Sequence, residues 1–497
     1  MPSTSPPIAH GRSKDRPALL MATPSGAIIE HPTLEMALDN GLDFVRPAMS
    51  ELTPVPEGWD IMTMPETRPV GYDPETAQFV TVDEFLIEAP DGSAQTIKPS
   101  AVAIHPPPGF VRRYHPAATF LDARHPDEKL EATGAGRLTV FQDTPAPKES
   151  DEARPGLPLW AYSAVGFGKQ GMVAAIFLAD EVSRWSPDIY YRDDLDERIE
   201  KRLNADPENR ILKQLSVCAK DYLCCCAQNI FYERWEGAVP SSPACTAACL
   251  GCLSKDPEWD TPVPQKRLKF SPEAAELSRV MAHHLETAPE PMISFGQGCE
   301  GEPTMFGDSL VESIRLTRQE TAKGVININC NGSRPQVIRD AAQAGATALR
   351  VSINTFDPAV FEAYYRPADY TMDTVLESLR AGRDAGMFVS INLLIWPGWT
   401  DRLAELDRIS ELVEQNLIHM IQLRNLCVDP GYFRSILPPR EKRGILMGMH
   451  QFVEELHRRH PTLRFGTFNP RLAADWYASV PAWVGAKKRK RSRVSAS

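Results

Sequence analysis

Apolar and polar residues follow two different patterns along the chain, and the pattern changes near residue 190. Before that point, short apolar runs are separated by turn residues in a proline-rich region, which is typical of β-strands. The expected strands are 27–30, 79–87, 137–142, 160–166 and 172–178. Gly168-Lys169-Gln170-Gly171 predicts a hairpin turn between the last two, and Asp91-Gly92 predicts a turn after the second. The pattern predicts a β-rich accessory domain over residues 18–190.

Residues 237–470 alternate apolar strands with amphipathic helices. The expected strands are 235–239, 292–295, 325–329, 348–353, 388–395 and 419–423. The expected helices are 308–320, one from Pro335 to Gly345, 358–365, 372–385, 402–416 and 440–459. Repeated βα units imply an α/β fold with a parallel sheet, and six units suit an open (β/α)6 barrel with its chemistry at the carboxyl ends of the strands. A doubly wound sheet fits the same periodicity.

Three further segments complete the predicted domain organisation. Residues 1–17 are rich in serine and proline and lack the apolar core of a signal peptide, so we expect a disordered N-terminus. Residues 191–236 form a helical, cysteine-containing connector that opens with a charged helix over 193–215. Residues 471–497 form a C-terminal extension, whose basic tail at 487–493 we expect to be solvated.

The composition is that of an ordinary globular protein. Of the 497 residues, 42% are hydrophobic and 24% are charged, and the formal net charge of −11 is spread along the chain. This charge argues against nucleic acid as a partner, although the basic tail keeps an anionic contact open. Because the chain contains no run of roughly eighteen apolar residues, we expect no membrane span and a cytoplasmic location.

The cysteines are unevenly distributed, since seven of the ten fall between Cys218 and Cys252. A secreted disulfide-rich protein would be smaller and would spread its cysteines, so the clustering indicates a metal site. Cys245, Cys249 and Cys252 have the spacing C-x3-C-x2-C. Three thiolates on one short loop can ligate three irons of a cubic cluster and leave the fourth iron open to a chelating ligand. A structural zinc loop with a distant fourth ligand is the alternative.

The motif, placed after the first strand of a βα barrel, resembles the signature of the radical S-adenosylmethionine (SAM) superfamily, over about residues 235–430. The resemblance implies that Cys245, Cys249 and Cys252 hold a [4Fe–4S] cluster whose open iron binds the amino and carboxylate groups of SAM. It implies reductive cleavage of SAM to a 5′-deoxyadenosyl radical, which abstracts a hydrogen atom from a substrate. A reducing electron donor such as ferredoxin or flavodoxin is the expected partner.

Further motifs follow the expected strands. Gly301-Glu302-Pro303 looks like the GGEP motif of the superfamily, which implies a hydrogen bond to the methionyl ammonium of SAM, although Glu300 replaces the usual first glycine. Ser352 and Asn354, two residues apart on one strand, resemble the ribose and carboxylate contacts. Arg366 lies in a Tyr-Arg-Pro segment that resembles a recurrent element of the superfamily between the fourth and fifth strands, where it could pair with a carboxylate. Each motif has an alternative without a ligand. The GGEP-like segment could be an ordinary acidic turn, Ser352 and Asn354 could simply line the barrel, and Arg366 could form a surface salt bridge.

Several other residues are candidates for a ligand or substrate. The segment 392–398 loosely resembles the element that packs on adenine. The polar groups Asn329, Asn331 and Arg424 end the third and sixth expected strands and could face a substrate or act as caps. Cys218 and Cys224, with a remote partner such as Cys299 or Cys427, could hold an auxiliary Fe–S cluster, or they could be buried thiols.

Two functions from different classes follow. The first is a radical SAM enzyme whose substrate, reaction type and catalytic residues the sequence does not identify. The second is a non-catalytic Fe–S or zinc-binding scaffold. The sequence contains no cobalamin-binding pattern of the Asp-x-His-x-x-Gly type, which argues against a cobalamin-dependent radical SAM enzyme.

Overall fold

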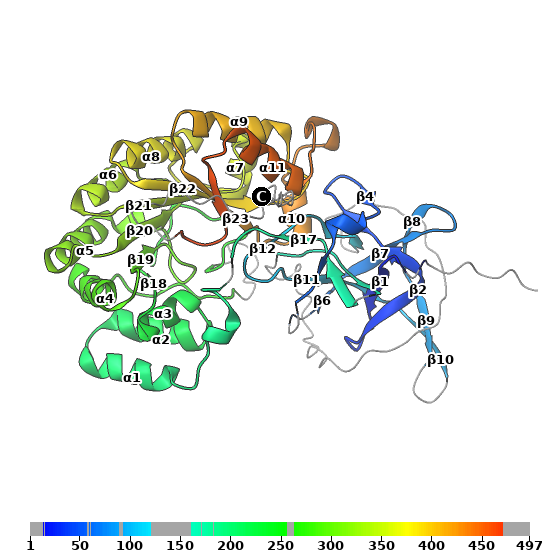
Figure 1. Ribbon diagram of the computed structural model, residues 1–497, viewed down its shortest axis with the longest axis horizontal. Coiled ribbons are helices and arrows are strands. Elements are labelled where there is room, and N and C mark those ends of the chain that lie inside the picture. The colour runs from blue at the N-terminus through cyan, green and yellow to red at the C-terminus, as the bar shows by residue number, and fades with distance from the viewer. Residues whose placement is uncertain are drawn as a thin grey trace, which may run out of the picture. The chain divides into compact units, whose positions relative to one another are not determined.

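The computed structural model describes residues 13–470, except for 14, 57, 58, 60, 89–92, 121–160, 170, 182 and 256–262 (Figure 1). Residues 1–12, the turn at 91–92, the expected strand at 137–142 and the extension at 471–497 therefore lie outside the described residues. The chain forms two compact units. Unit 1 contains residues 1–177, 397–399 and 427–443, and unit 2 contains residues 178–396, 400–426 and 444–497.

Unit 1 is built from antiparallel strands, as the pattern of the first region predicts. Its main sheet contains β1 (Ala18–Ala22), β2 (Ile28–Met36), β5 (Thr53–Pro54), β6 (Ile61–Met64), β7 (Thr67–Asp73), β8 (Gln78–Thr81), β11 (Ser100–Ile104), β14 (Ala118–Phe120), β15 (Val165–Gly168) and β16 (Gly171–Ala174). The predicted hairpin is confirmed, because β15 pairs with β16 and the two strands close at Gly168 and Gly171. Gly171 has a φ of +105°, a conformation that glycine adopts at no steric cost.

Smaller elements complete unit 1. They are β3 (Leu38–Asp39), β4 (Phe44–Val45), β9 (Phe85–Glu88), β10 (Ala94–Ile97), β12 (Phe110–Arg112), β13 (His115–Pro116), β17 (Ile176–Leu178), α10 (Pro430–Ser435) and the 3-10 helices η1 (Met49–Glu51) and η4 (Arg440–Lys442). The expected strand 79–87 is wrong as a single strand, since β8 and β9 divide it and pair with different partners. The expected strand 172–178 is likewise divided, at Ala175.

Unit 2 contains a curved sheet of seven parallel strands in chain order (Figure 1). The strands are β18 (Glu236–Ala238), β19 (Met292–Phe295), β20 (Val325–Cys330), β21 (Ala348–Ile353), β22 (Phe388–Ile395), β23 (Met420–Asn425) and β24 (Arg464–Gly466). The six predicted strands are all confirmed, and β24 adds a short seventh at the edge. The sheet is a partial barrel, because its edge strands β18 and β24 do not pair with each other.

Helices connect these strands and cover the outside of the curved sheet (Figure 1). They are α4 (Ala274–Thr287), α5 (Gly307–Glu320), α6 (Pro335–Ala344), α7 (Pro358–Tyr365), α8 (Met372–Asp384), α9 (Leu403–Glu414) and α11 (Met449–Arg459), with the 3-10 helices η2 (Pro187–Ile189) and η3 (Pro303–Phe306). The expected helix 440–459 is wrong before Met449, because Gly444 and Gly448 have positive φ angles that interrupt a helix. None of the helices in the described part of the chain has both the length and the apolar character that a bilayer crossing requires.

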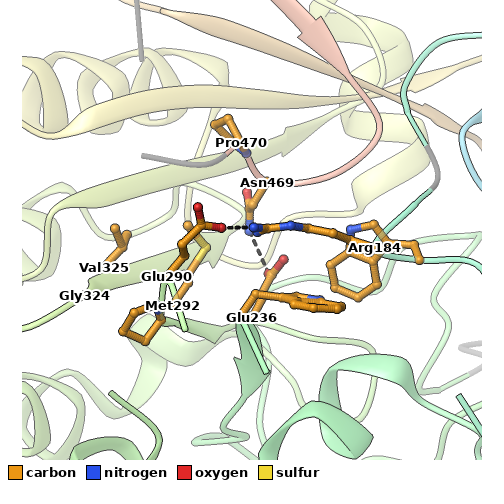
Figure 2. Close-up of a pocket in the computed structure, with 11 residues that line it drawn as sticks. Arg184, Glu236, Glu290, Met292, Gly324, Val325, Asn469 and Pro470 are labelled. Atoms are coloured by element: carbon orange, nitrogen blue, oxygen red, sulfur yellow. Dashed lines mark hydrogen bonds and ion pairs between the residues drawn. The ribbon is translucent and has the colours of Figure 1, made fainter. Parts of the chain in front are cut away.

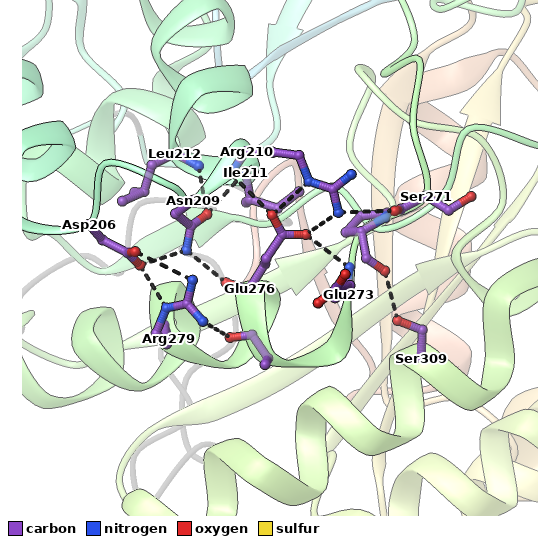
Figure 3. A network of polar contacts seen from close by, with 12 residues as sticks. Asp206, Asn209, Arg210, Ile211, Leu212, Ser271, Glu273, Glu276, Arg279 and Ser309 are labelled. Atoms are coloured by element: carbon purple, nitrogen blue, oxygen red, sulfur yellow. Dashed lines mark hydrogen bonds and ion pairs between the residues drawn. The ribbon is translucent and has the colours of Figure 1, made fainter.

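Three helices precede the sheet: α1 (Leu195–Ala205), α2 (Arg210–Lys220) and α3 (Cys225–Tyr232). The expected single helix 193–215 is wrong, because the chain breaks at residues 206–209 and restarts with Asn209 as the N-cap of α2. Figure 3 shows how this break is fixed to α4. Arg210 binds the carboxylate of Glu276 through Nε at 2.8 Å and Nη2 at 2.5 Å, and Arg279 binds Asp206 at 2.8 Å.

The strands of unit 2 alternate apolar and polar side chains, which is why the interior of the barrel is polar. Apolar residues such as Ile293, Ile328 and Val351 are fully buried and fit the face that the helices cover. The intervening residues are polar and form hydrogen bonds with one another within and between strands. They are Ser294, Asn327, Asn329, Arg350, Ser352, Asn392 and Gln422. We call the space that these polar side chains line the lumen.

Candidate functional site

The loop that follows β18 carries Cys245, Cys249 and Cys252, and we call residues 239–254 the cysteine loop. All three thiols are free and partly exposed. Burial raises the pKa of Cys245 to about 11 and that of Cys249 well above its ordinary value, and the neighbouring thiols raise the pKa of Cys249 further. The Arg267 guanidinium, 3.6 Å from the sulfur of Cys252, lowers the pKa of the other two and so favours thiolates.

The donor set suits an iron–sulfur cluster, because thiolates are the usual protein ligands of such clusters. Within the described ranges, no three His, Cys, Asp or Glu side chains converge closely enough to enclose a metal ion. A cubic cluster binds each thiolate at a different iron, so it does not require the three thiols to converge on one point.

Glu300 fixes the cysteine loop to the end of β19. Its side chain is only 4% exposed. One carboxylate oxygen accepts from the backbone N–H of Ser241 at 2.7 Å, the hydroxyl of Ser241 at 3.0 Å and the N–H of Ser242 at 3.2 Å. The other accepts from the N–H of Gly296 at 2.5 Å and of Gln297 at 3.3 Å. Burial raises the pKa of Glu300 to about 7, although these donors oppose the shift. The residue that departs from the GGEP pattern is thus the one that ties these two segments together.

Gly301 and Glu302 lie directly against the cysteine loop. The backbone N–H of Gly301 donates to Ser242 at 2.7 Å, and that of Glu302 donates to Ala244 at 2.8 Å. A Cβ at position 301 would lie 1.9 Å from the carbonyl oxygen of Ala244, so only glycine permits this approach. The Glu302 carboxylate accepts from the N–H of Thr304 at 3.1 Å, which caps the η3 helix that Pro303 begins.

Glu302 also reaches the next strand, since its second oxygen accepts from the backbone N–H of Asn331 at 2.7 Å. The carboxylate is buried, and burial raises its pKa. Thr246 of the cysteine loop makes a second connection to the same segment. Its hydroxyl accepts from Asn331 Nδ2 at 2.8 Å and donates to the hydroxyl of Ser333 at 3.0 Å. The end of β20 therefore holds the cysteine loop through a side chain between two of its cysteines.

The cysteine loop also binds the C-terminal end of α7 and the residues that follow it. The N–H groups of Ala248 and Leu250 donate to the carbonyls of Tyr365 and Tyr364, both at 3.0 Å. Ala247 and Pro367 form an isolated β-bridge. Arg366 has a φ of +47° and ends α7 in the left-handed region, so its backbone turns the chain toward the loop. The Tyr-Arg-Pro element is thus explained by its backbone contacts with the cysteine loop.

Ser352 lies in β21 and Asn354 directly follows this strand, and both are on the face toward the lumen. Asn354 is 1% exposed, and neither its Nδ2 nor its Oδ1 has a hydrogen-bond partner among the described residues. An unpartnered buried amide is costly, so this side chain fits a site that receives a ligand. Ser352 accepts a hydrogen bond from Asn392 Nδ2 at 3.2 Å, while Asn392 Oδ1 is buried and has no partner in the part of the chain that the structure describes.

The remaining cysteines are arranged differently from the cysteine loop. Cys218 on α2 and Cys299 are both buried, and their thiols form a hydrogen bond that lowers the pKa of Cys218 and raises that of Cys299. Cys224 is near enough to act electrostatically on both. Cys427 belongs to unit 1, and Cys330 is buried in β20. The auxiliary cluster at Cys218 and Cys224 stays a prediction.

Sequence reasoning did not identify Thr246, Arg267 or the role of Glu300. A threonine between two motif cysteines carries no distinctive spacing, and Arg267 reaches Cys252 from fifteen residues further along the chain. Glu300 was visible as a departure from a motif, and a charged residue at a glycine position was the signal that it has a partner of its own.

A sequence model of the radical SAM superfamily matches residues 239–409. Solved structures with similarity to this chain include anSMEcpe with bound AdoMet, at 14% identity and a TM-score of 0.31, over 40% of this chain and 52% of that chain. Methylornithine synthase (PylB) matches at 13% identity and a TM-score of 0.32, over 54% of this chain and 74% of that chain. HydG, a maturase of the [FeFe]-hydrogenase, matches at 15% identity and a TM-score of 0.31, over 55% of this chain and 62% of that chain.

The chain thus spans about half the length of the first of these structures, 52%. Among curated proteins, no match was found.

Proposed function

We propose that this chain, whose residues 239–409 belong to the radical SAM superfamily, reductively cleaves SAM at a [4Fe–4S] cluster held by Cys245, Cys249 and Cys252. The observation that carries the proposal is the buried Asn354 amide, which is unpartnered among the described residues at the carboxyl end of the same parallel sheet as the cysteine loop. In a parallel α/β sheet, ligands bind at these strand ends. When bound, the cluster and SAM supply one-electron cleavage of a sulfonium to give a 5′-deoxyadenosyl radical.

The residues of this chain have distinct tasks in the proposed reaction. Cys245, Cys249 and Cys252 are the iron ligands, and the charge of Arg267 favours the thiolate forms of Cys245 and Cys249. Asn354 can donate to one oxygen of SAM and accept from one hydroxyl or ammonium, because a carboxamide carries both kinds of group.

The GGEP-like turn contributes in another way. The Glu302 carboxylate has donors from Thr304 and Asn331 and retains lone pairs for an ammonium, since a carboxylate offers about four acceptor sites. Gly301 allows the turn to approach the cysteine loop, which keeps the proposed ammonium site next to the proposed cluster site.

The proposed reaction needs one electron for each SAM cleaved, so a low-potential donor such as ferredoxin or flavodoxin is the partner that we propose. The reducing cytoplasm suits this chemistry. In support, the three cysteines of the cysteine loop are free thiols.

The proposal is tested with anaerobically reconstituted protein, dithionite and SAM. We expect about four irons per chain and the release of 5′-deoxyadenosine. Cys249→Ala removes both, whereas Cys225→Ala, which alters another partly exposed cysteine, on α3, leaves both unchanged. A Cys249→Ala protein that still releases 5′-deoxyadenosine contradicts the assignment. A colourless protein loaded with zinc supports the scaffold function instead.

A further inference from the structure

The side chain of Asn469 lies in the lumen with a complete set of hydrogen-bond partners. Its Nδ2 donates to Glu236 Oε1 at 2.7 Å and to the Ser294 hydroxyl at 3.4 Å. Its Oδ1 accepts from Gln422 Nε2 at 2.7 Å and from Arg350 Nη1 at 3.3 Å. These four partners come from β18, β19, β21 and β23, and each is at most 6% exposed. A primary carboxamide therefore satisfies donors and acceptors from four strands at once.

Asn469 does not belong to a strand. It follows β24 in the segment 467–470, which lies at the open edge of the partial barrel. Asp180 holds this segment by accepting from the backbone N–H of Thr467 at 2.7 Å and of Phe468 at 3.0 Å. The hydrogen bond between Asn469 and Glu236 connects the segment after β24 to β18, and these two edge strands do not pair with each other in the described part of the chain (Figure 2).

A pocket of about 300 Å³ adjoins this segment on its other side. It is lined by Trp185, Trp235 and Met292, with Glu236 and Asn469 at its wall. An ion pair between Arg184 and Glu290 crosses it, and the Arg184 guanidinium lies 5.2 Å from the centre of the Trp235 ring (Figure 2). Asn469 is therefore a wall of this pocket and at the same time fills a polar position in the lumen.

The lumen has more hydrogen-bonding capacity than Asn469 uses. Arg350 Nε, Asn392 Oδ1 and both amide atoms of Asn354 are buried and have no partner among the described residues. Arg350 and Ser352 of β21 and Asn354, which directly follows the strand, are spaced by two, so they lie on one face. Unpartnered buried polar atoms are rare in proteins, and a row of them indicates a ligand larger than one side-chain amide.

We propose that the lumen is an amide-recognition site, and that the substrate of the radical reaction presents a carboxamide where Asn469 now lies. This inference rests on the proposed function for the role of the ligand as substrate. The partner set selects an amide over a carboxylate, because Glu236 accepts on one side and Gln422 and Arg350 donate on the other. A ligand carboxylate would place two acceptor-only groups at 2.7 Å, whereas an amide N–H₂ donates to Glu236.

Substrate binding then requires the segment 467–470 to withdraw and Asn469 to leave the lumen. This movement breaks the hydrogen bonds of Asn469, the two that Asp180 accepts, and the contacts of the Phe468 ring with Trp185 and Arg424. A bound carboxamide restores the partners that Asn469 leaves in the lumen. The adjoining pocket offers the route by which a small amide reaches the position.

The test replaces Asn469 by alanine in the full-length reconstituted protein and adds acetamide as the probe. We expect Asn469→Ala to lower the Tm and acetamide to raise it again in a saturable way. Acetate binds at least about tenfold more weakly, because it loses the donor toward Glu236. Acetamide leaves the Tm of the wild-type chain unchanged, since Asn469 occupies the position. Asn204→Ala, an exposed asparagine on α1, is the matched control and shows no response.

Adding Arg350→Met or Gln422→Ala to Asn469→Ala removes the response to acetamide, and far-UV circular dichroism confirms that each double variant is folded. Two variants are used so that one misfolded protein does not decide the result. An Asn469→Ala protein that ignores acetamide, or that binds acetate equally well, overturns the inference. These outcomes are independent of 5′-deoxyadenosine release, so failure of the proposed function and failure of the amide site are seen separately.

Discussion

Glu300→Ala tests the claim that one buried carboxylate holds the cysteine loop in place. In the native chain this side chain accepts from the backbone N–H groups of Ser241, Ser242, Gly296 and Gln297. Alanine leaves these four donors without their acceptor. At about 1 kcal/mol for each, the low end of the usual cost of an unsatisfied buried group, the free energy of unfolding falls by about 4 kcal/mol.

The assay is denaturant unfolding of the anaerobically purified protein at pH 8, followed by iron analysis after reconstitution. We expect Glu300→Ala to bind less iron as well, because the chain enters the cysteine loop through Ser241 and Ser242. Glu320→Ala, an exposed glutamate at the end of α5, serves as the control and changes stability by no more than about 0.5 kcal/mol. If Glu300→Ala costs less than about 1 kcal/mol and binds iron like the wild type, the anchoring role is refuted.

Four further predictions concern the same region. Gly301→Ala forces a Cβ to within 1.9 Å of the carbonyl of Ala244, so iron binding is lost, whereas Gly168→Ala, whose Cβ would meet no atom nearer than 3.8 Å, retains it. Thr246→Val removes a hydroxyl that makes two buried hydrogen bonds and lowers stability by about 2 kcal/mol, measured by denaturation, with a lower iron content. Asn354→Ala lowers SAM affinity about tenfold in equilibrium binding but costs little stability, because the amide has no partner to lose among the described residues. Burial raises the pKa of Glu300 to about 7 from an ordinary 4.5, so its folded form prefers the proton. The free energy of unfolding is therefore higher by roughly 3 kcal/mol below pH 4.5 than above pH 7, because the folded state holds the proton more tightly than the unfolded state, and Glu300→Gln removes this pH dependence in unfolding measured across that range.

The strands and helices of unit 2 could be predicted wherever local pattern and packing agree. Met292–Phe295 and Ala348–Ile353 have the predicted bounds, because each is a short run whose apolar residues face the helices. The break at Asn209 and the late start of α11 at Met449 were missed, although a capping asparagine and the glycines at 444 and 448 were present as local signals. In both places the amphipathic pattern continues past the point where the helix ends or begins, so the pattern alone conceals the boundary.

The candidate site shows the same division. Three cysteines at a fixed spacing can be recognised without a structure, since the spacing itself carries the chemistry. The long-range contacts cannot be predicted in this way. Glu300 reaches back fifty-eight residues to hold Ser242 of the cysteine loop, and Asn469 bonds to Glu236 in the lumen across a separation of 233 residues. The inclusion of residues 397–399 and 427–443 in unit 1 also depends on long-range packing that has no local pattern.

The central claim is that one iron of the cluster stays free of protein ligands and binds SAM. The most direct measurement is the electron paramagnetic resonance spectrum of the reduced, reconstituted protein with and without SAM. We predict that SAM shifts the g values of the cluster signal in the wild-type protein, and that no cluster signal forms in Cys249→Ala. A cluster signal that is identical in the presence and absence of saturating SAM contradicts the account.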